Sequence, residues 1–564
     1  MRTTDEAADE HQPFSFDDLV WIVADARIDG REDLVRTLNA TGRDASLQRP
    51  DVELILHAYQ VWGEACVEHL LGDFAFAIWD ETKLRLFCAR DHFGVKPFFY
   101  AQLGDCLVFS NTLNTVRLHP AVSDELNEQT IADFLLTGYN YENAATVFAS
   151  ILRLPAANTL VCTMNSLRMC NYWSLPVDGY IRYKRSGEYV EHFNELLYKA
   201  VADRIRNDCV AVSMSGGLDS TMIATATNNL LSADGQSNKL QAFTLVYDHL
   251  IPDRERHYSN LAAQSLGIPI HFLPLDNYGL YERWDRPELQ ASEPNDFPFS
   301  AFVFDYLSGM ARHSRVRLTG EGGDSLLCPS ESYFTRLLKN GRVDLLARYI
   351  GRHLWLHGQI PPLGFRSVVK RWLGRQQTWQ WQYPVWFNQD FARQLNLRAR
   401  LQQLEGEPPS IHPTRPEAYN QLNNGYWASY FEKWDPGMTR VPIEGRHPLF
   451  DPRLVEYLLA IPPIPWCVNK ELFRVSMQGW LPDEIRYRKK SPLAGNAVYE
   501  LLQQKGNEWV DNFSPTPMLE KFVDRRAIPK LVGEQDVNQL WLNIRPLGLN
   551  MWLQNFKLGD FNSN

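Results

Sequence analysis

The sequence is poor in cysteine, and the few cysteines it has form no recognisable framework. Eight are spread over 564 residues, with no C-x-x-C pair and no cluster with histidine at the spacing of a zinc site. This scatter excludes a disulfide-stapled secreted domain and a zinc finger. We therefore expect reduced, mostly buried thiols, as in cytosolic proteins.

Long apolar runs and an excess of positive charge are also missing. No stretch of 18 apolar residues is present, and residues 1–14 (MRTTDEAADEHQPF) are polar and acidic, unlike a signal peptide. The formal net charge of −10 argues against a general nucleic-acid binder. We expect a soluble, cytoplasmic protein with no nucleic-acid partner and no membrane partner.

Apolar residues, in contrast, are plentiful: they make up 45% of the sequence, enough to fill the cores of two or three domains. Up to about residue 175, short alternating strands are separated by turns, which predicts an α+β domain over residues 1–175. A stretch rich in Pro, Gly and charge after Trp173 is the expected linker. The expected strands are 70–80, 83–90 and a hairpin over 97–110, and residues 51–63 have helical spacing.

The second half of the chain alternates strands with helices from residue 186 onward. This alternation predicts a doubly wound α/β domain with a parallel sheet over residues 186–564, whose ligands bind beyond the carboxyl ends of the strands. One expected helix begins near Glu188, and two others cover 221–231 and 257–267. The expected strands are 210–214, 240–247 and 268–275.

The motif SMSGGLDS (213–220) stands between one of these strands and the helix that follows it. A loop of small residues at a helix N-terminus lets backbone N–H groups converge on an anion. No lysine follows the glycines, so the motif is not a Walker loop. Its S-G-G-x-D-S pattern resembles the pyrophosphate loop of ATP pyrophosphatases, which cut ATP between its α and β phosphates. The alternative is an ordinary Gly/Ser turn.

Several motifs in order resemble the asparagine synthetase superfamily. GDFAFAIWD and ARDHFGVKPFFY (89–100) resemble its amino-terminal glutaminase domain. SMSGGLDS, LTGEGGDSLL (318–327), EGRHPLFDPRLVEYLLAIP (444–462) and LPDEIRYRKKSP (481–492) resemble its synthetase domain. The resemblance implies a class II glutaminase-like (Ntn-hydrolase-like) α+β sandwich followed by an ATP-pyrophosphatase domain.

One departure from the family pattern changes the expected function. The family's glutaminases use a cysteine at position 2, whereas this sequence has Arg2, and its first cysteine is Cys66. Without a thiolate nucleophile no thioester forms, so glutamine supplies no ammonia. The glutamine clamp of the family is also missing upstream of ARIDGREDL (26–34). We therefore interpret the first domain as a retained scaffold, with binding of a peptide or partner as the alternative.

Relatives without the cysteine include β-lactam synthetases and lasso-peptide macrolactam (isopeptide) cyclases. The ARIDGRE opening and the GEGGDSLL form resemble the cyclases, and Glu321 stands where β-lactam synthetases commonly have tyrosine. The resemblance implies a ligase that adenylates an Asp or Glu side chain of a precursor peptide and joins it to the peptide's amino terminus, with a leader-peptide protease as a partner. The alternatives are an ammonia-dependent asparagine synthetase, a β-lactam synthetase-like ligase, and a relative that only binds peptide.

The resemblance also assigns roles to single residues, with ATP and Mg²⁺ as cofactors. Asp219 and Asp324 are the expected magnesium ligands, because carboxylates in glycine-bearing turns leave room for phosphate and water. Glu321 is either a general base for the attacking amine or a structural carboxylate. The residues expected to cradle pyrophosphate are Ser215, Gly216, Gly217, Leu218, Asp219 and Ser220, and those beside the adenosine are Met214, Leu245, Thr319 and Gly320.

The remaining expectations concern charged residues near the site and one segment rich in Arg, Trp and Gln. Lys490, rather than Lys489, aligns with the family's lysine beside the α-phosphate, although a basic run is often only a solvated face. We expect Glu444, Arg446 and Asp451 to brace the wall of the active site. The segment from Arg342 to Trp386 is rich in Arg, Trp and Gln; it either packs as helices or contacts a peptide substrate.

Overall fold

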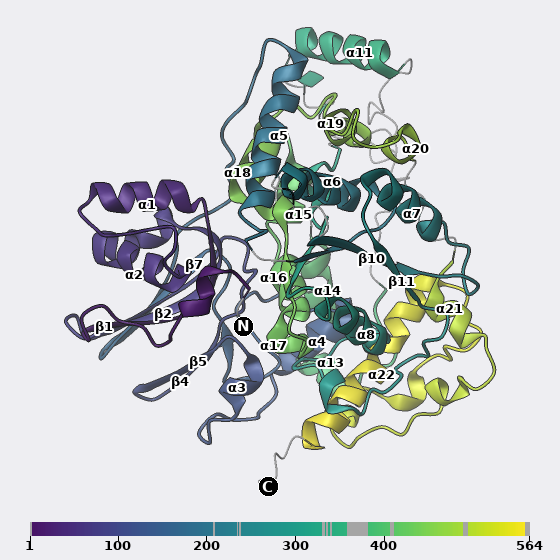
Figure 1. The fold of residues 1–564 in the computed structure, drawn as a ribbon. Coiled ribbons are helices and arrows are strands. Elements are labelled where there is room, and N and C mark those ends of the chain that lie inside the picture. The colour runs from purple at the N-terminus through teal and green to yellow at the C-terminus, as the bar shows by residue number, and fades with distance from the viewer. Residues whose placement is uncertain are drawn as a thin grey trace.

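A computed structural model describes residues 3–206, 209–233, 235, 239–329, 333, 337–338, 341–357, 382–406, 411–488 and 495–558. The amino-terminal part lies to one side of a larger carboxy-terminal part (Figure 1). Residues 172–185, between the last strand of the first part and the first helix of the second, contain no helix or strand.

The amino-terminal part is an antiparallel sandwich with helices on both outer faces. Its larger sheet has the order β1-β2-β3-β7-β8 and its smaller one the order β5-β4-β6. The strands are β1 (Val20–Asp29), β2 (Leu71–Asp80), β3 (Arg85–Arg90), β4 (Phe99–Leu103), β5 (Cys106–Ser110), β6 (Leu152–Arg153), β7 (Asn158–Thr163) and β8 (Ser166–Asn171). The helices are α1 (Arg31–Ala40), α2 (Asp51–Trp62), α3 (Leu113–Arg117) and α4 (Glu128–Thr137).

The alternation in β2 explains why this sheet has two buried faces. Phe74, Phe76 and Ile78 pack with residues of α1 and α2, while Ala75 and Ala77 pack with residues of the smaller sheet. Side chains alternate across a strand, so both sets are buried at once. The small alanines allow the two sheets to approach closely.

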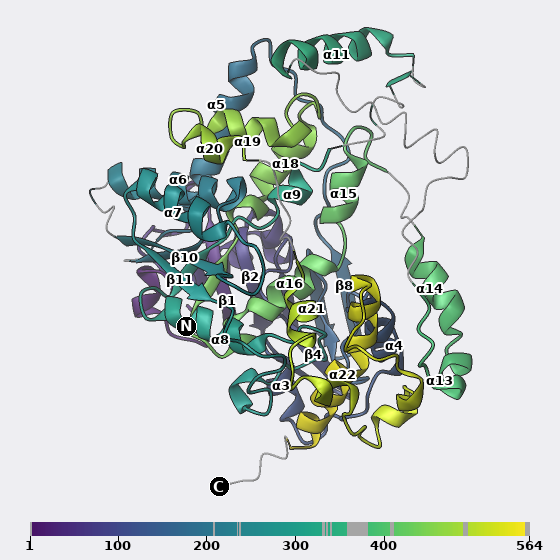
Figure 2. The ribbon, with the colours of Figure 1, turned by 90° about the vertical axis from the view of Figure 1, so that its right-hand side faces the viewer.

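The carboxy-terminal part is built on a parallel sheet with the order β11-β10-β9-β12-β13. The strands are β9 (Val210–Ser213), β10 (Leu240–Val246), β11 (Ile270–Pro274), β12 (Val316–Leu318) and β13 (Glu444–Arg446). Helices cover both faces: α6 (Leu218–Ala233) and α7 (Glu255–Leu266) lie on one side and α8 (Ser300–Ala311) on the other (Figure 2). The expected parallel sheet and two-part layout are confirmed.

The order of strands reverses between β9 and β12, because β10 and β11 extend the sheet on one side of β9 and β12 and β13 on the other. Such a reversal opens a crevice at the carboxyl ends of the two strands, and ligands of doubly wound sheets bind there. Both Gly-rich motifs follow these two strands.

Further helices pack around this sheet and against the first part. They include α5 (Ser186–Ala202), α9 (Gly323–Leu326), α11 (Val343–His357), α13 (Gln389–Gln394), α14 (Leu397–Glu405), α15 (Pro416–Leu422), α16 (Tyr426–Trp434), α17 (Pro436–Thr439), α18 (Pro452–Ala460), α19 (Glu471–Ser476), α20 (Asp483–Arg486), α21 (Ala497–Leu502) and α22 (Val537–Leu558). One apolar cluster unites residues of α4, α13 and α22, so the two parts share a core.

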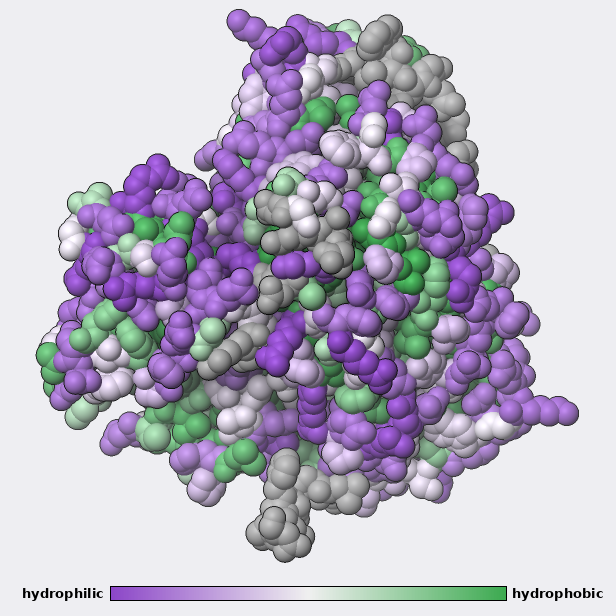
Figure 3. Space-filling view, viewed as in Figure 1, coloured by the Kyte–Doolittle hydropathy of each residue, from purple (hydrophilic) through white to green (hydrophobic). Residues whose placement is uncertain are grey.

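All eight cysteines lie in the described part of the chain, and none of them forms a disulfide. Cys66, Cys88 and Cys467 are buried, but Cys106 and Cys209 are exposed, so the expectation of mostly buried thiols is only partly right. Hydrophilic side chains dominate the face in Figure 3, with smaller apolar patches between them. Among the described residues, no helix has the length and apolar character needed to cross a membrane.

Candidate functional site

The loop of the SMSGGLDS motif joins β9 to the first turn of α6, as the sequence predicts. The N–H of Ser215 donates to Oγ of Ser220 at 3.0 Å, and the N–H of Gly217 donates to Oγ of Ser215 at 3.2 Å. A Cβ on Gly216 would lie 2.3 Å from Cβ of Tyr258, so only glycine fits there. The loop is therefore a compact turn at the positive end of the α6 dipole.

A second loop, after β12, touches the first one directly. A Cβ on Gly320 would lie 2.5 Å from the backbone nitrogen of Ser220, and one on Gly323 would lie 2.5 Å from Cγ of Asp219. Both glycines are needed for this close approach. It brings the carboxylate of Asp324, in α9, to the same crevice as Asp219.

Lys470 lies between these two aspartates, and the sequence analysis missed it. Its Nζ contacts Oδ2 of Asp219 and lies 2.7 Å from Oδ1 of Asp324. The lysine stands just before α19, some 250 positions along the chain from Asp219, with no motif around it. Only the fold brings it here.

The two aspartates fit a magnesium site that phosphate would complete. Their carboxylates converge on one cation, the ammonium of Lys470, and hard oxygens are the ligands that Mg²⁺ prefers. Among the described residues no group of three or more His, Cys, Asp or Glu side chains could hold a metal ion. Phosphate oxygens and water would have to supply the remaining ligands, as is usual for Mg²⁺ in nucleotide sites.

The N–H of Gly216 already points at an anion, the carboxylate of Glu255 in α7. It donates to Oε2 of Glu255 at 2.6 Å, while Oε1 of Glu255 lies 2.8 Å from Nη2 of Arg488. The loop can therefore bind a negatively charged group in this position. Neither Glu255 nor Arg488 was singled out from the sequence, although Arg488 belongs to the basic run RYRKK.

The residues expected beside the adenosine lie at the carboxyl ends of three adjacent strands. Met214 is buried after β9, where its carbonyl accepts from Oγ1 of Thr244 at 2.5 Å. Leu245 is the last but one residue of β10, and Thr319 follows β12, where its Oγ1 lies 2.7 Å from Nδ1 of His447. The structure thus brings these residues to one edge of the sheet.

Glu321 is held by a tyrosine that the sequence analysis did not predict. The hydroxyl of Tyr430, in α16, hydrogen-bonds to its carboxylate. Burial raises the pKa of Glu321; Asp219 and Asp324 add to this, while the hydrogen bond and Arg317 act against it. A half-buried carboxylate with a raised pKa suits a group that accepts a proton near neutral pH.

Two of the predictions reach outside the described residues. Lys490 and Lys489 lie outside them, so the structure places neither, and the same holds for 358–381 of the Arg- and Trp-rich segment. At its end, Trp386 is fully buried and donates from Nε1 to Oδ1 of Asn543 at 2.9 Å. For Trp386 the packing interpretation is correct.

The residues expected to brace the site form ion pairs and hydrogen bonds at the junction of the two parts. Arg446 donates to the carbonyl of Arg204 at 2.6 Å, and Asp451 lies 3.0 Å from Arg204. Glu444 lies 3.3 Å from Nζ of Lys96, which belongs to the first part. The wall that follows β13 is therefore fixed by ion pairs at the junction of the two parts.

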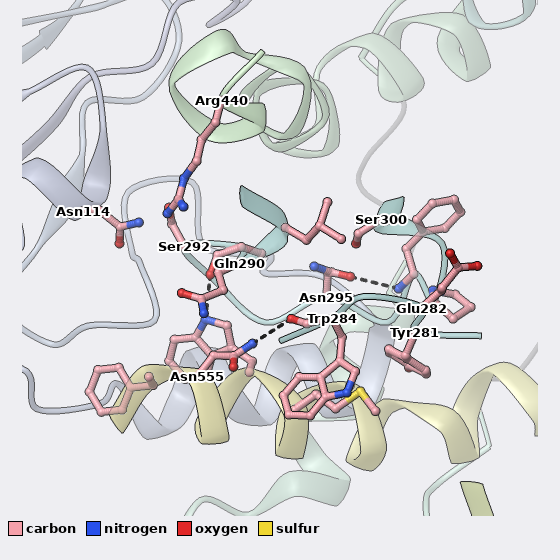
Figure 4. Close-up of a pocket in the computed structure, with 18 of the residues that line it drawn as sticks. Asn114, Tyr281, Glu282, Trp284, Gln290, Ser292, Asn295, Ser300, Arg440 and Asn555 are labelled. Atoms are coloured by element: carbon pink, nitrogen blue, oxygen red, sulfur yellow. Dashed lines mark hydrogen bonds between the residues drawn. The ribbon is translucent and has the colours of Figure 1, made fainter. Parts of the chain in front are cut away.

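A hollow of about 180 Å³ lies between other residues of the two parts (Figure 4). It is bounded by α3, the β11–α8 connection and α22, with Arg440 reaching in from above and Asn555 lying on α22. Aromatic residues such as Trp284 and Trp552 form much of its wall. None of the predicted site residues lines it.

The chain matches the sequence profiles of two families. The asparagine synthase profile matches residues 192–554, and the glutamine amidotransferase domain profile matches residues 2–173. The order of the two matches agrees with the order of the two parts in the structure.

Individual relatives are distant in sequence, and their matches cover between about half and nine tenths of the chain. The chain is 24% identical over 539 residues to "Asparagine synthetase [glutamine-hydrolyzing] 3" of Bacillus subtilis, covering 91% of this chain and 82% of that protein. It is 28% identical over 292 residues to asparagine synthetase 2 of the same organism, covering 49% and 38%. It is 25% identical over 296 residues to "Amidase chry2" of Gibberella zeae, covering 49% and 42%.

The asparagine synthase profile covers well over half of the chain, and it includes both Gly-rich loops, the two aspartates and Lys470. The matched region also contains the whole parallel sheet with its crevice. From the profile match and these features together, we conclude that the chain belongs to the asparagine synthase family of ATP-dependent amide-forming ligases.

Proposed function

We propose that the protein is a peptide macrolactam cyclase of the lasso-peptide type. It would adenylate an Asp or Glu side chain of a precursor peptide and join it to the peptide's own amino terminus, with AMP and pyrophosphate as by-products. One combination of observations carries the proposal: the crevice keeps both Gly-rich loops and both aspartates, while position 2 does not carry the cysteine that the family's glutaminases use. Position 2 is arginine, and burial raises the pKa of the thiols of Cys66 and Cys88.

Adenylation needs groups that hold phosphates as negative charge builds on them. ATP with Mg²⁺ would supply the activated phosphoryl group. Asp219 and Asp324 would hold the metal, the SGGLDS loop would hold the leaving pyrophosphate through backbone N–H groups, and Lys470 would stabilise its charge. Lys490 is the further cation that we propose beside the α-phosphate.

Amide formation needs a base for the attacking amine. We assign this role to Glu321, because it is half-buried, its pKa is raised, and Tyr430 fixes its carboxylate by a hydrogen bond. An amine tethered to the activated carboxylate within one molecule would reach a high effective concentration, so no ammonia supply would be required.

Relatives named glutamine-hydrolysing asparagine synthetases favour a second candidate, an asparagine synthetase that uses free ammonia. One assay separates the two. Purified protein with ATP, magnesium, a candidate precursor peptide and its leader-removing protease should give a peptide lighter by one water, together with AMP and pyrophosphate. The same protein with aspartate and ammonium should give no asparagine. Asparagine formation with the peptide left linear would establish the second candidate.

A further inference from the structure

A cavity of about 290 Å³ lies at the junction of the two parts and has no assigned role. The first part contributes the loop after α4, the β6–β7 connection and the end of β8; the second contributes the turn between α15 and α16 and the first turn of α16. Ligand pockets in proteins begin at about 300 Å³, so the cavity suits a short segment of a ligand.

The lining is unusually rich in side-chain amides. Asn158 and Asn171 face each other across β7 and β8, and each donates its amide nitrogen to a backbone carbonyl, of Ala156 at 2.7 Å and Ala157 at 3.0 Å. Their side-chain oxygens are then the groups that can accept a hydrogen bond from a ligand. The asparagines of the lining are Asn140, Asn143, Asn158, Asn171, Asn423 and Asn424.

Charges in the lining are already paired with other protein groups. Arg153 contacts Glu293 and lies 2.9 Å from Oε2 of Glu432, and Glu142 lies 2.8 Å from Nη2 of Arg400. His92 is almost fully buried, and burial lowers the pKa of His92 to about 4, so its ring is neutral. The cavity therefore favours an uncharged polar ligand over an ion.

Aromatic rings supply the apolar part of the wall. Trp173 packs edge-on against His92 with the ring centroids 5.0 Å apart, and Trp427 lines the opposite part, from α16. Aromatic faces combined with amide donors and acceptors match a peptide chain, whose bonds present both an N–H and a carbonyl between apolar side chains.

The position of the cavity connects it to the adenylating crevice. Its lining includes residues 422–425 and reaches Ser429 on α16, and the next residue, Tyr430, holds Glu321. The same helix, α16, therefore lines the cavity with one side chain and contacts the expected base with the next one. A peptide bound in the cavity would lie against the helix that holds Glu321.

We propose that this amide-lined cavity binds an uncharged segment of the peptide substrate through its backbone, so that the amino-terminal part acts as half of the substrate site. The proposal deepens the function proposed above and rests on it. It gives the first part a binding role in place of the lost glutaminase chemistry.

Direct binding can be tested without ATP, which separates the cavity from the catalytic proposal. The probe is a capped tripeptide, N-acetyl-trialanine methylamide, observed by saturation-transfer NMR on the full chain. Asn423→Trp should fill the cavity mouth and weaken binding at least about tenfold, the size of one or two lost hydrogen bonds. Asn165→Trp, at the exposed β7–β8 turn, is the matched control and should bind as wild type.

A second ligand and a second variant complete the test. The ligand shows whether the cavity prefers a peptide backbone or the side-chain amide of glutamine, and the variant controls for misfolding. L-glutamine should bind much more weakly than the capped tripeptide; preferential binding of glutamine would overturn the peptide assignment. The double variant Asn158→Leu, Asn171→Leu removes two acceptors without filling the cavity and should also weaken tripeptide binding, with thermal unfolding checking that it folds. Equal tripeptide binding by wild type and both variants would overturn the proposal.

The outcome is distinguishable from failure of the proposed function. If tripeptide binds in the cavity but no peptide is cyclised with ATP, the cyclase proposal falls and the binding site stands. If peptide is cyclised and Asn423→Trp cyclises it with unchanged KM, the cavity proposal falls while the function stands.

Discussion

Lys470 shows how one cation can organise a site for polyphosphate. Its ammonium contacts carboxylates from two different strand ends, Asp219 and Asp324, and so holds them together although they repel each other. In the proposed function, Asp219 and Asp324 would hold the metal ion and Lys470 would face the phosphates. The crevice therefore exists as a preorganised arrangement of charge before the nucleotide enters.

Replacing this lysine should abolish adenylation. In Lys470→Met the developing charge on pyrophosphate loses its cation, so we expect ATP–pyrophosphate exchange to fall roughly 100- to 1,000-fold. The exposed Lys199, paired only with Glu195 on the same helix, supplies the control Lys199→Met. Exchange within a few-fold of wild type in Lys470→Met would show that this ammonium does not act on the phosphates.

The contact between Glu321 and Tyr430 leads to a prediction about the pH dependence of the reaction rate. A base must be ionised to act, so the rate should fall as pH drops through the raised pKa of Glu321. The hydrogen bond from Tyr430 lowers that pKa, and its removal in Tyr430→Phe should move the acidic limb of kcat/KM to higher pH. Tyr198→Phe, which loses only a hydrogen bond from Asn229, should leave the limb in place. An unmoved limb in Tyr430→Phe would assign Glu321 a structural role.

The amino-terminal part should have no glutaminase activity. Position 2 carries arginine, and burial raises the pKa of Cys66 and Cys88 so that neither is a thiolate near neutral pH. Glutamate release from glutamine should stay at the level of a protein-free blank, with or without ATP and peptide. Release that scales with the concentration of pure protein would contradict this.

The sequence predicted the parts of the site that follow from local patterns. A Gly-rich loop between a strand and a helix is recognisable because strand, loop and helix N-terminus are adjacent in the chain, and the two aspartates stand inside such loops. Glu255 and Tyr430 escaped because each is a common residue type on an ordinary helix, and Lys470 escaped because it stands in a turn before α19 that carries no motif. Their roles come from packing contacts between elements far apart in the chain, which no local pattern encodes.

Among the secondary structure elements, those with strong periodicity were predicted well. The expected strand 240–247 is β10 (Leu240–Val246), and the expected helix 257–267 is α7 (Glu255–Leu266). The large helical region after β12 was harder, because its short helices are held by long-range apolar contacts. Trp386 illustrates this: its neighbours in sequence are Arg-, Trp- and Gln-rich, yet it lies in a cluster with α4 and α22.

Trp386 should be a main support of that shared cluster. It is completely buried, with 0% of its surface exposed to solvent, so Trp386→Ala leaves a large cavity and removes the hydrogen-bond donor of Oδ1 of Asn543. We expect the free energy of unfolding to fall by about 3–5 kcal/mol. Trp480→Ala, at a tryptophan that is 53% exposed, should cost far less. Equal losses in urea unfolding would show that the cluster is not a common core.

Taken as a whole, the molecule is held together by buried charges as well as by apolar contacts. Arg204, just after α5, lies 3.1 Å from Asp29 in the first part and 3.0 Å from Asp451 in the second. Arg27 binds Asp29 at 2.8 Å and also Asp73. Buried pairs contribute little net stability compared with apolar packing, but they penalise any other arrangement of the two parts. They thus fix how the first part faces the adenylating crevice.

Breaking this network should weaken the molecule in a pH-dependent way. Burial alone would raise the pKa of Asp29, but Arg204 and Arg27 outweigh it and hold this pKa well below its usual range. A carboxyl with a depressed folded pKa stabilises the protein above its unfolded pKa, about 3.9, and this stabilisation is lost as pH falls toward the folded pKa. The contribution of the network is therefore complete at neutral pH.

Arg204→Met removes the arginine that joins the two carboxylates while keeping most of its apolar volume. At about pH 7 we expect a loss of about 3–5 kcal/mol in the free energy of unfolding, because Asp29 and Asp451 remain buried with fewer partners. The difference from wild type should shrink below about pH 4, where the unfolded chain and then the variant's carboxyls bind protons. Arg36→Met, at an arginine whose side chain is 73% exposed, is the control and should change stability by less than about 1 kcal/mol at either pH. Urea unfolding at both pH values measures the difference, and a loss that stays constant down to acid pH would show that apolar packing, rather than charge, makes Arg204 necessary.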